Sequence, residues 1–326
     1  MSESSLVLRA ARPDDRAAII SLLAASLGRD DDERYPALYA WKHEENPFGV
    51  SPAWVAEDNG TLCAIRVFMR WEFRARGEVR RAVRAVDTAT HPDYQGQGLF
   101  TRLTRHGLAE VAADGVDFVF NTPNDQSRPG YLKMQWQTVG RLPVAIRPRS
   151  AGSLVRLARA RVPAERWSIP TTAGERAAEA FAETSSIDAL LGRLAPTDRL
   201  TTLRSAAFFR WRYGTELLQY RVITAPKGIE HGFVVFRLRR RGGAVEAAIG
   251  DVVVAGDDHR LARSMLATVR RTSRADYAIA LGRRPSGFVP FPRQGPILTW
   301  RHAAATATDV PSLADLECTL GDIELF

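Results

Sequence analysis

The chain has 326 residues, of which 45% are hydrophobic and 25% charged, with two cysteines and a formal net charge of +8. This composition excludes wholesale disorder, a collagen-like repeat and a disulfide scaffold, and the length favours two domains. No apolar run approaches the eighteen residues of a membrane span, and no charged-then-apolar leader opens the sequence, so we predict a soluble cytoplasmic protein with no membrane partner and with reduced cysteines.

Nearly all of the cations are arginines, since lysine occurs only at positions 42, 133 and 227. A positive field favours an anionic ligand such as a nucleotide or a phosphorylated carrier, although the coding bias of a GC-rich genome is the simpler explanation of the arginine excess. The basic runs at residues 80–81 and 237–241 are short and lack interleaved aromatic residues. We therefore predict no nucleic-acid partner.

The chain begins with a predicted strand and helix. Residues 6–15 alternate like a strand and then reach Pro13, Asp14 and Asp15, a proline and two acids that are typical of a first helical turn. Gly28 is expected to end the helix. Helical spacing predicts its buried face, which comprises Ala17, Ile20, Leu23, Ala24 and Leu27.

Three strand-like runs follow at residues 53–57, 61–71 and 79–90, and Asn59-Gly60 predicts a two-residue hairpin between the first two. A turn with glycines at 96 and 98 then opens into a helix. The apolar residues of that helix are Leu99, Leu103, Leu108 and Val111. A buried strand at 116–121, a short helix at 128–136 and a strand at 138–146 complete this half.

The second half repeats this order more faintly. Trp41-Lys42 has a counterpart in Trp211-Arg212, and the matching strand segments are 54–57 with 220–223, 60–68 with 228–236, and 116–120 with 275–279. A repeat of this length indicates two copies of one domain. We predict domains at 1–147 and 171–326, joined by a proline-broken linker at 148–170. The fold class is α/β, with mixed, mostly antiparallel sheets flanked by helices.

The glycine-containing turn after residue 90 is the most informative candidate for a ligand-binding site. Backbone amides from Gln97 to Thr101 would be unpaired donors at a helix N-terminus, where the helix dipole also favours a phosphate or pyrophosphate. An ordinary tight turn would need the same glycines. The turn is neither a Walker A loop, since no GK[ST] follows, nor the start of a parallel βαβ unit, since it comes after an antiparallel meander.

Residues 95–100, Gln-Gly-Gln-Gly-Leu-Phe, are similar to the Q/R-x-x-G-x-G/A signature of the GNAT superfamily of acyl-CoA-dependent N-acyltransferases, with Phe100 in place of the usual small residue. A second match is Asn124, followed seven residues later by Tyr131, which opens a Y-x-K-x-G-F-like segment with Gln135 in place of glycine. The resemblance covers about residues 6–146. It implies two tandem GNAT-like domains, the second one degenerate.

The resemblance implies acetyl-CoA, or another acyl-CoA, as cosubstrate, and Tyr131 as the general acid that protonates the departing thiolate. The pantetheine arm and the thioester carbonyl would bind to the backbone of Thr88, Ala89 and Thr90. The remaining residues implied in cofactor binding are Gln95, Gly96, Gln97, Gly98, Leu99, Phe100, Thr101 and Asn124.

The base that takes the amine proton stays open at this stage. Asp87 and Glu57 are candidates because they lie on strands expected to border the cleft, whereas His91 before a proline is more typical of a capping or surface residue. A narrower resemblance to Eis-type tandem acetyltransferases implies the carboxylate of the last residue, Phe326, although the chain lacks room for the third domain of that group. In the second copy residues 255–260 have two aspartates and no glycine pair, which predicts no CoA binding there and a role in shaping the acceptor cleft or a dimer.

The sequence thus predicts an enzyme that transfers an acyl group, most simply acetyl, to a primary amine of a small molecule. A protein lysine or N-terminal acetyltransferase is the alternative enzyme, and a CoA-binding scaffold without turnover is the alternative outside the enzymes. The six histidines show no metal-ligand spacing, so we predict no metal. A small-molecule amine is the expected partner, and a homo-oligomer stays open.

Overall fold

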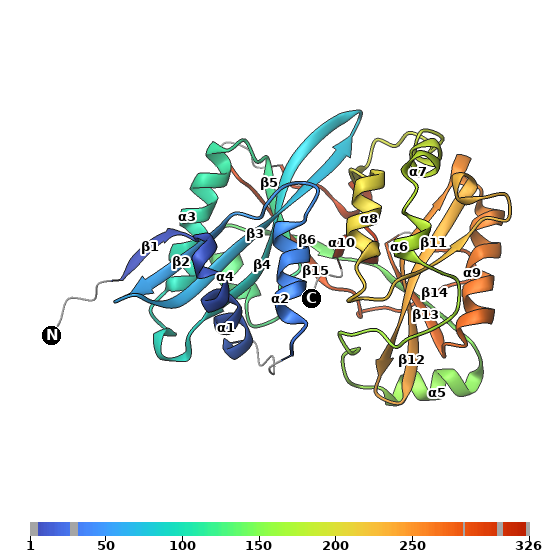
Figure 1. Ribbon diagram of the computed structural model, residues 1–326, viewed down its shortest axis with the longest axis horizontal. Helices are drawn as coiled ribbons and strands as arrows, with labels where there is room; N and C mark the ends of the chain where they lie inside the picture. Colours follow the sequence, from blue (N-terminus) through green and yellow to red (C-terminus); the bar gives the residue numbers. More distant parts are fainter. Residues whose placement is uncertain (1–5, 27–31, 283, 305–308, 324–326) are drawn as a thin grey trace. The chain divides into compact units, whose positions relative to one another are not determined.

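The computed structural model describes residues 6–26, 32–282, 284–304 and 309–323. It divides into two units, shown with their elements in Figure 1. The first unit comprises Met1–Arg74, Glu78–Gly140 and Ile297–Ser312, and the second comprises Ala75–Gly77, Arg141–Pro296 and Leu313–Phe326. Two mixed sheets flanked by helices confirm the predicted α/β fold class.

The first unit is built on one mixed sheet. Its strands, in spatial order, are β1 (Val7–Ala10), β2 (Ala53–Asp58), β3 (Thr61–Ala75), β4 (Glu78–Thr90), β5 (Phe118–Asn121), β15 (Ile297–His302) and β6 (Gln137–Arg141). β2 pairs antiparallel with β1 and β3, whereas β4 and β5 run parallel. Asn59 and Gly60, both at positive φ, make the predicted turn between β2 and β3.

Helices cover this sheet at the three positions expected from the sequence and also at residues 35–44, where no helix was predicted. They are the 3-10 turn η1 (Pro13–Asp15), α1 (Arg16–Ser26), α2 (Tyr35–Tyr39), the π-helical turn η2 (Ala40–Glu44), the 3-10 turn η3 (Pro92–Tyr94), α3 (Leu99–Ala113) and α4 (Arg128–Lys133). The four apolar residues predicted for α3 are all buried. In α1 the prediction of the face was partly wrong, because the buried residues are Ile19, Leu22 and Leu23, while Ala17 is exposed. The predicted Leu27 and Gly28 lie outside the described residues.

The strand predicted at 138–146 is two strands, β6 and β7 (Val144–Pro148). The strand is interrupted at Leu142-Pro143, because proline has no backbone N–H to donate to the hydrogen bonds between neighbouring strands. β7 pairs with β13 (Tyr277–Leu281) and belongs to the sheet of the second unit.

The second unit repeats the meander of the first. Its sheet has the order β14 (Val289–Pro290), β7, β13, β12 (Ala244–Val254), β11 (Gly232–Arg241), β10 (Arg221–Thr224) and β8 (Glu175–Arg176). β12 runs parallel to β13, as β4 does to β5, and α9 (His259–Ser273) connects them as α3 does in the first unit. The other helices are α5 (Ala151–Arg159), α6 (Ala177–Ala180), α7 (Thr184–Leu191), α8 (Ala206–Gly214) and α10 (Leu320–Ile323). The remaining elements are η4 (Ile229–His231), η5 (Ala255–Asp257), η6 (Leu313–Asp315) and the short strands β9 (Leu200–Thr202) and β16 (Leu316–Glu317).

The predicted domain ranges differ from the two units of the structure in two respects. Residues 297–312, predicted as part of a continuous domain 171–326, belong to the first unit, and the division of the chain falls at Gly140 rather than at residue 147. β15 pairs with β5, and the ring of Trp300 stacks on that of Phe118 with their centroids 3.7 Å apart. Burial of these rings joins β15 to a sheet far from it in sequence.

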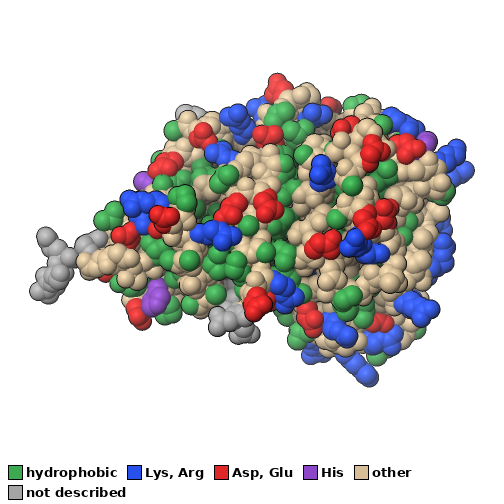
Figure 2. Space-filling model, viewed as in Figure 1, with side chains coloured by type: hydrophobic (Ala, Val, Ile, Leu, Met, Phe, Trp, Pro, Cys, Tyr) green, Lys and Arg blue, Asp and Glu red, His purple; other side chains and the backbone are tan. Residues whose placement is uncertain are grey.

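Charged side chains are spread over the surface. On the face drawn in Figure 2, Lys and Arg side chains are interspersed with Asp and Glu. Among the described residues, no helix is long and apolar enough to cross a membrane. The same part of the chain holds no group of three or more His, Cys, Asp or Glu side chains placed to bind a metal ion.

Candidate active site

The predicted phosphate-binding turn is formed between β4 and α3. Gly96 and Gly98 have φ values of +78° and +72°, and Gly98 is the N-cap of α3. A Cβ atom at either glycine would meet no other atom within 4 Å, so the left-handed backbone, and not crowding, explains the glycines. The first amides of α3 have no partner within the helix, and they stand at the positive end of its dipole.

A cavity of about 510 Å³ opens beside this turn. Most of the residues predicted to bind the cofactor line it, together with two that the prediction missed, Ser26 at the end of α1 and Tyr94 in η3. The predicted lining residues are Thr88, Ala89, Thr90, Gln95, Gly96, Gly98, Leu99 and Phe100. The structure therefore brings the end of β4 and the first turn of α3 together around one space.

Strand β4 changes its conformation where it reaches the cavity. Its parallel pairing with β5 covers Ala82 to Arg84, and Asp87 then has a φ of +39°, which is rare for a residue with a side chain. Thr88, Ala89 and Thr90 follow and line the cavity. Because this segment lies beyond the residues paired with β5, its backbone groups on that side are placed to bind an extended ligand.

Tyr131 lies behind the cavity wall. It is buried on α4, and its ring meets the ring of Phe100 edge-on with the centroids 5.2 Å apart. Its hydroxyl oxygen accepts a hydrogen bond of 2.8 Å from Nη1 of Arg66 on β3. The same nitrogen donates to Oγ1 of Thr88, which lines the cavity. Arg66 thus connects the predicted general acid to the predicted pantetheine segment.

The other predicted cofactor residues lie outside the cavity wall. Gln97 and Thr101 are not among its lining residues, although both belong to the turn and the first helical turn. Asn124 is exposed, and its Oδ1 accepts hydrogen bonds from the backbone N and the hydroxyl of Ser127, at 2.8 and 2.9 Å. Asn124 therefore orders the turn that precedes α4, which carries Tyr131.

Asp87 is held by two buried basic side chains. Its Oδ2 lies 2.5 Å from Nζ of Lys42 and 2.8 Å from Nε2 of His43, and Nδ1 of His43 lies 3.0 Å from Oγ of Ser51. Burial lowers the pKa of His43, which favours its neutral form at pH 7. Asp87 also lines a second, much smaller pocket with Tyr39, whose pKa burial and the nearby Asp87 charge raise to about 12.

Glu57, the other carboxylate predicted as a base, faces Arg9. Its Oε2 lies 2.5 Å from Nη2 of Arg9, and the same guanidinium binds Asp15 at 2.6 Å. Hydrogen bonding to Arg9 lowers the pKa of Asp15. Glu57 does not line the large cavity.

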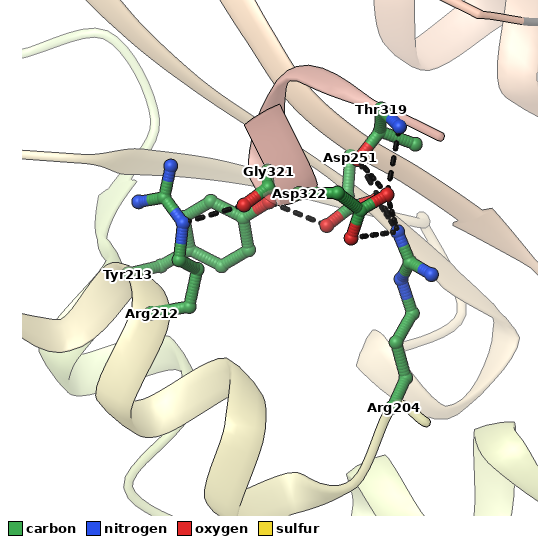
Figure 3. Close-up of polar contacts among 7 residues, drawn as sticks. All are labelled: Arg204, Arg212, Tyr213, Asp251, Thr319, Gly321 and Asp322. Carbon is green, nitrogen blue, oxygen red and sulfur yellow. Dashed lines mark hydrogen bonds and ion pairs between the residues drawn. The ribbon is translucent and has the colours of Figure 1, made fainter. Parts of the chain in front are cut away.

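The carboxylate predicted at Phe326 lies outside the described residues. The helix that precedes it, α10, is fixed inside the second unit by a buried polar network (Figure 3). Arg204 binds Asp251 at 2.8 Å and Asp322 at 3.2 Å, and Nε of Arg212 donates to the carbonyl of Gly321 at 2.7 Å. The hydroxyl of Tyr213 donates to Asp251, and burial raises the pKa of that carboxyl.

In the second unit the turn before α9 differs from the turn before α3. Gly256 and Asp257 both have positive φ, and the carboxylate of Asp258 caps α9. Its Oδ1 accepts hydrogen bonds from the amides of Arg260 and Leu261, each at 3.0 Å. In the first unit the backbone amides at the start of α3 would face a phosphate. The corresponding amides at the start of α9 are already hydrogen-bonded to the carboxylate of Asp258.

Comparison with known proteins identifies the first unit. Residues 7–139 match a family model described as an acetyltransferase (GNAT) domain. The chain carries a GNAT acetyltransferase domain. This match confirms, for residues 7–139, the resemblance carried by residues 95–100, Asn124 and Tyr131, and with it the predicted N-acetyltransferase class of that domain. A search of the curated proteins finds none that matches this sequence.

Solved structures show the same fold over nearly the whole chain. A probable N-acyltransferase from Enterococcus faecalis superposes with a TM-score of 0.63 at 9% identity, over 92% of this chain and 73% of that one. A GCN5-related N-acetyltransferase from Anabaena variabilis gives 0.60 at 13% identity, with the same two shares. Eis1 from Mycobacterium abscessus gives 0.56 at 15% identity, over 91% of this chain and 73% of its own.

Arg66 is a further residue of this GNAT domain that was not predicted from the sequence. It stands in the middle of the apolar run Cys63-Ala64-Ile65-Arg66-Val67-Phe68-Met69. A lone charge in a buried strand needs a partner, and that was the available signal. The partners of Arg66 are Thr88 on β4 and Tyr131 on α4, however, and their proximity to β3 cannot be predicted before the order of the strands is known.

Proposed function

We propose that this GNAT protein transfers an acetyl group from acetyl-CoA to a primary amine of a small molecule, with Tyr131 as general acid. The observation that supports it is the cavity at the N-terminus of α3, lined by Thr88, Ala89 and Thr90 on one side and by the turn with Gly96 and Gly98 on the other. Free helix amides, a strand end beyond the residues paired with β5 and a buried phenol behind Phe100 suit the diphosphate, pantetheine and thioester parts of one cosubstrate.

The chemistry proceeds by direct attack. Acetyl-CoA supplies the acetyl group as a thioester, and the amine attacks its carbonyl carbon. A carbon–nitrogen bond forms, the carbon–sulfur bond breaks, and the Tyr131 hydroxyl gives its proton to the departing sulfur. The proton lost by the amine goes to one of the candidate bases, of which Asp87 adjoins Thr88 at the cavity.

The cosubstrate site is tested by calorimetric titration of acetyl-CoA into the wild type and the pair Gly98→Asp and Gly98→Asn. Both side chains tolerate the left-handed conformation of Gly98 and have nearly the same shape, so the pair differs by one negative charge at the diphosphate site. We expect Gly98→Asp to bind at least about tenfold more weakly than Gly98→Asn because of like-charge repulsion.

Equal affinities of the two variants would place the diphosphate elsewhere. A well-folded wild type that binds no acetyl-CoA would contradict the proposal, and longer acyl-CoA donors would be tested next.

The general acid is tested by Tyr131→Phe, with Tyr94→Phe as the matched control. Tyr94 lines the same cavity, but its hydroxyl donates to Asp58 at 3.0 Å and is not bonded to Arg66. We expect Tyr131→Phe to bind acetyl-CoA normally and to lose roughly 10²-fold or more in kcat, measured as thiol release with small primary amines. Tyr94→Phe should keep kcat within a few-fold.

Unchanged turnover in Tyr131→Phe would remove this phenol from the mechanism. Turnover with lysine peptides or protein N-termini, and not with small amines, would favour the protein acetyltransferase instead. Binding of acetyl-CoA without turnover of any acceptor would favour the scaffold.

A further inference from the structure

Arg66 is a buried cation with little to balance its charge. It is 1% exposed in the centre of β3, and no carboxylate forms an ion pair with it among the described residues. Two of its nitrogens, Nε and Nη2, are buried and have no hydrogen-bond partner in the described part of the chain. Such a charge is costly to remove from water unless something compensates it.

The contacts that Arg66 does make are with hydroxyl groups and rings. Its Nη1 donates to Thr88 and, at 2.8 Å, to Tyr131. The guanidinium carbon lies 4.8 Å from the ring centroid of Phe68, 5.7 Å from that of Phe100 and 5.3 Å from that of Tyr131. The faces of these rings stabilise a cation, but they carry no net negative charge.

A guanidinium can donate hydrogen bonds and cannot accept them. The oxygens of Thr88 and Tyr131 therefore both serve as acceptors toward Arg66, and each hydroxyl hydrogen must point to another acceptor. For Thr88 that direction includes the cavity, which its side chain lines. The Tyr131 hydroxyl likewise keeps its proton for an acceptor other than Arg66.

We propose that Arg66 is a positioning residue for Tyr131 and that its counter-ion is the phenolate that Tyr131 becomes during the reaction. This inference rests on the proposed function. As the carbon–sulfur bond breaks, sulfur takes the phenol proton, and the phenolate forms 2.8 Å from a charge that is already in place. The proton released by the amine later restores the phenol, so protons balance over one turnover.

The test compares Arg66→Met and Arg66→Lys with the wild type. Methionine fills a similar apolar space and removes the charge, so we expect kcat to fall at least tenfold, the KM for acetyl-CoA to stay within about twofold, and the melting temperature to stay level or rise. Arg66→Lys keeps the positive charge and should retain more of kcat than Arg66→Met does.

A double-mutant cycle with Tyr131→Phe separates this inference from the proposed function. If Arg66 acts through Tyr131, adding Arg66→Met to Tyr131→Phe should change kcat by less than about twofold. A large further loss in the double variant would overturn the inference and leave Tyr131 as the acid. A wild-type kcat in Tyr131→Phe would instead overturn the proposed function itself.

A purely structural role for Arg66 gives a different pattern. Arg66→Met would then have a lower melting temperature and an unchanged kcat per folded molecule, which would also overturn the inference. If Arg66→Met folds poorly, Arg66→Lys alone and combined with Tyr131→Phe provides the same cycle. In that cycle a loss of kcat that disappears in the Tyr131→Phe background supports the inference.

Discussion

Phe100 occupies a position at which the GNAT signature has a small residue, and Gly130 explains how it fits. A Cβ atom at Gly130 would lie 2.9 Å from Cε1 of Phe100, closer than carbon atoms pack. The missing side chain on α4 therefore makes room for the large one on α3. The Phe100 ring meets the ring of Tyr131 and also lines the cavity, so it connects the predicted acid to the cavity wall.

Gly130→Ala should displace the Phe100 ring and lower the free energy of unfolding by roughly 1–3 kcal/mol, the usual cost of overpacking. Urea denaturation measures this, and Gly152→Ala on α5 is the control, since its Cβ would meet only Ser150 Oγ at 3.8 Å. Alanine there should be neutral or stabilising. Phe100→Ala should remove the clash, so the double variant should be less destabilised than the sum of the single ones.

Single residues of the site were predictable where a local motif carries them. The turn with Gly96 and Gly98 lies within one short stretch, and its glycines are required by local backbone conformation. Arg66 was not predictable, because its role depends on Thr88 and Tyr131, which come from other elements. Sequence spacing shows what a residue can do locally and does not show which distant side chain it will meet.

At the scale of elements, the two units share a buried carboxylate on the strand that precedes the turn. In the first unit Asp87 binds Lys42 and His43, and in the second Asp251 binds Tyr213, which follows Arg212 in the corresponding Trp-basic-aromatic segment. The predicted match of Trp41-Lys42 with Trp211-Arg212 thus extends to the partner strand. An arrangement present beside both turns favours a structural role for Asp87 over that of a base.

Asp87→Asn should therefore act mainly on stability. It removes the negative charge that faces the buried Lys42, and we expect a loss of about 3 kcal/mol in the free energy of unfolding. Adding Lys42→Met should recover much of this loss, because the cation is then also gone. Chemical denaturation measures the stability, and thiol release measures turnover per folded molecule, which should stay within a few-fold. A stable Asp87→Asn protein without turnover would instead identify Asp87 as the base.

For the molecule as a whole, the two units should differ in their response to cosubstrate. α3 presents free amides beside a cavity, whereas Asp258 already caps α9. We expect one acetyl-CoA per chain, since an internal carboxylate at the second helix would repel a diphosphate. Calorimetry with the wild type gives the stoichiometry directly. Two sites per chain, or one site that survives Gly98→Asp unchanged, would show that the second unit also binds.

The repeated meander and the fold class were predictable from the sequence, because alternating strands and helix caps are local patterns. The return of β15 to the first sheet was not predicted. The sequence of this strand, Ile-Leu-Thr-Trp-Arg-His, would suit either sheet by pattern alone, and pairing between residues such as Arg301 and Val119 leaves no local trace. Long-range pairing of this kind is decided by packing, here by Trp300 on Phe118.

Because of strand β15, the first unit can complete its folding only late in translation. The other strands of the first unit are translated by residue 141, yet the place between β5 and β6 stays empty until Ile297–His302 has been made, after nearly all of the second unit. Domains usually fold in the order of their synthesis. Here the earlier unit has to wait for the later one. A ribosome that stalls between them releases an unfinished sheet with open edges, so translation of the second unit becomes a checkpoint on the activity of the first.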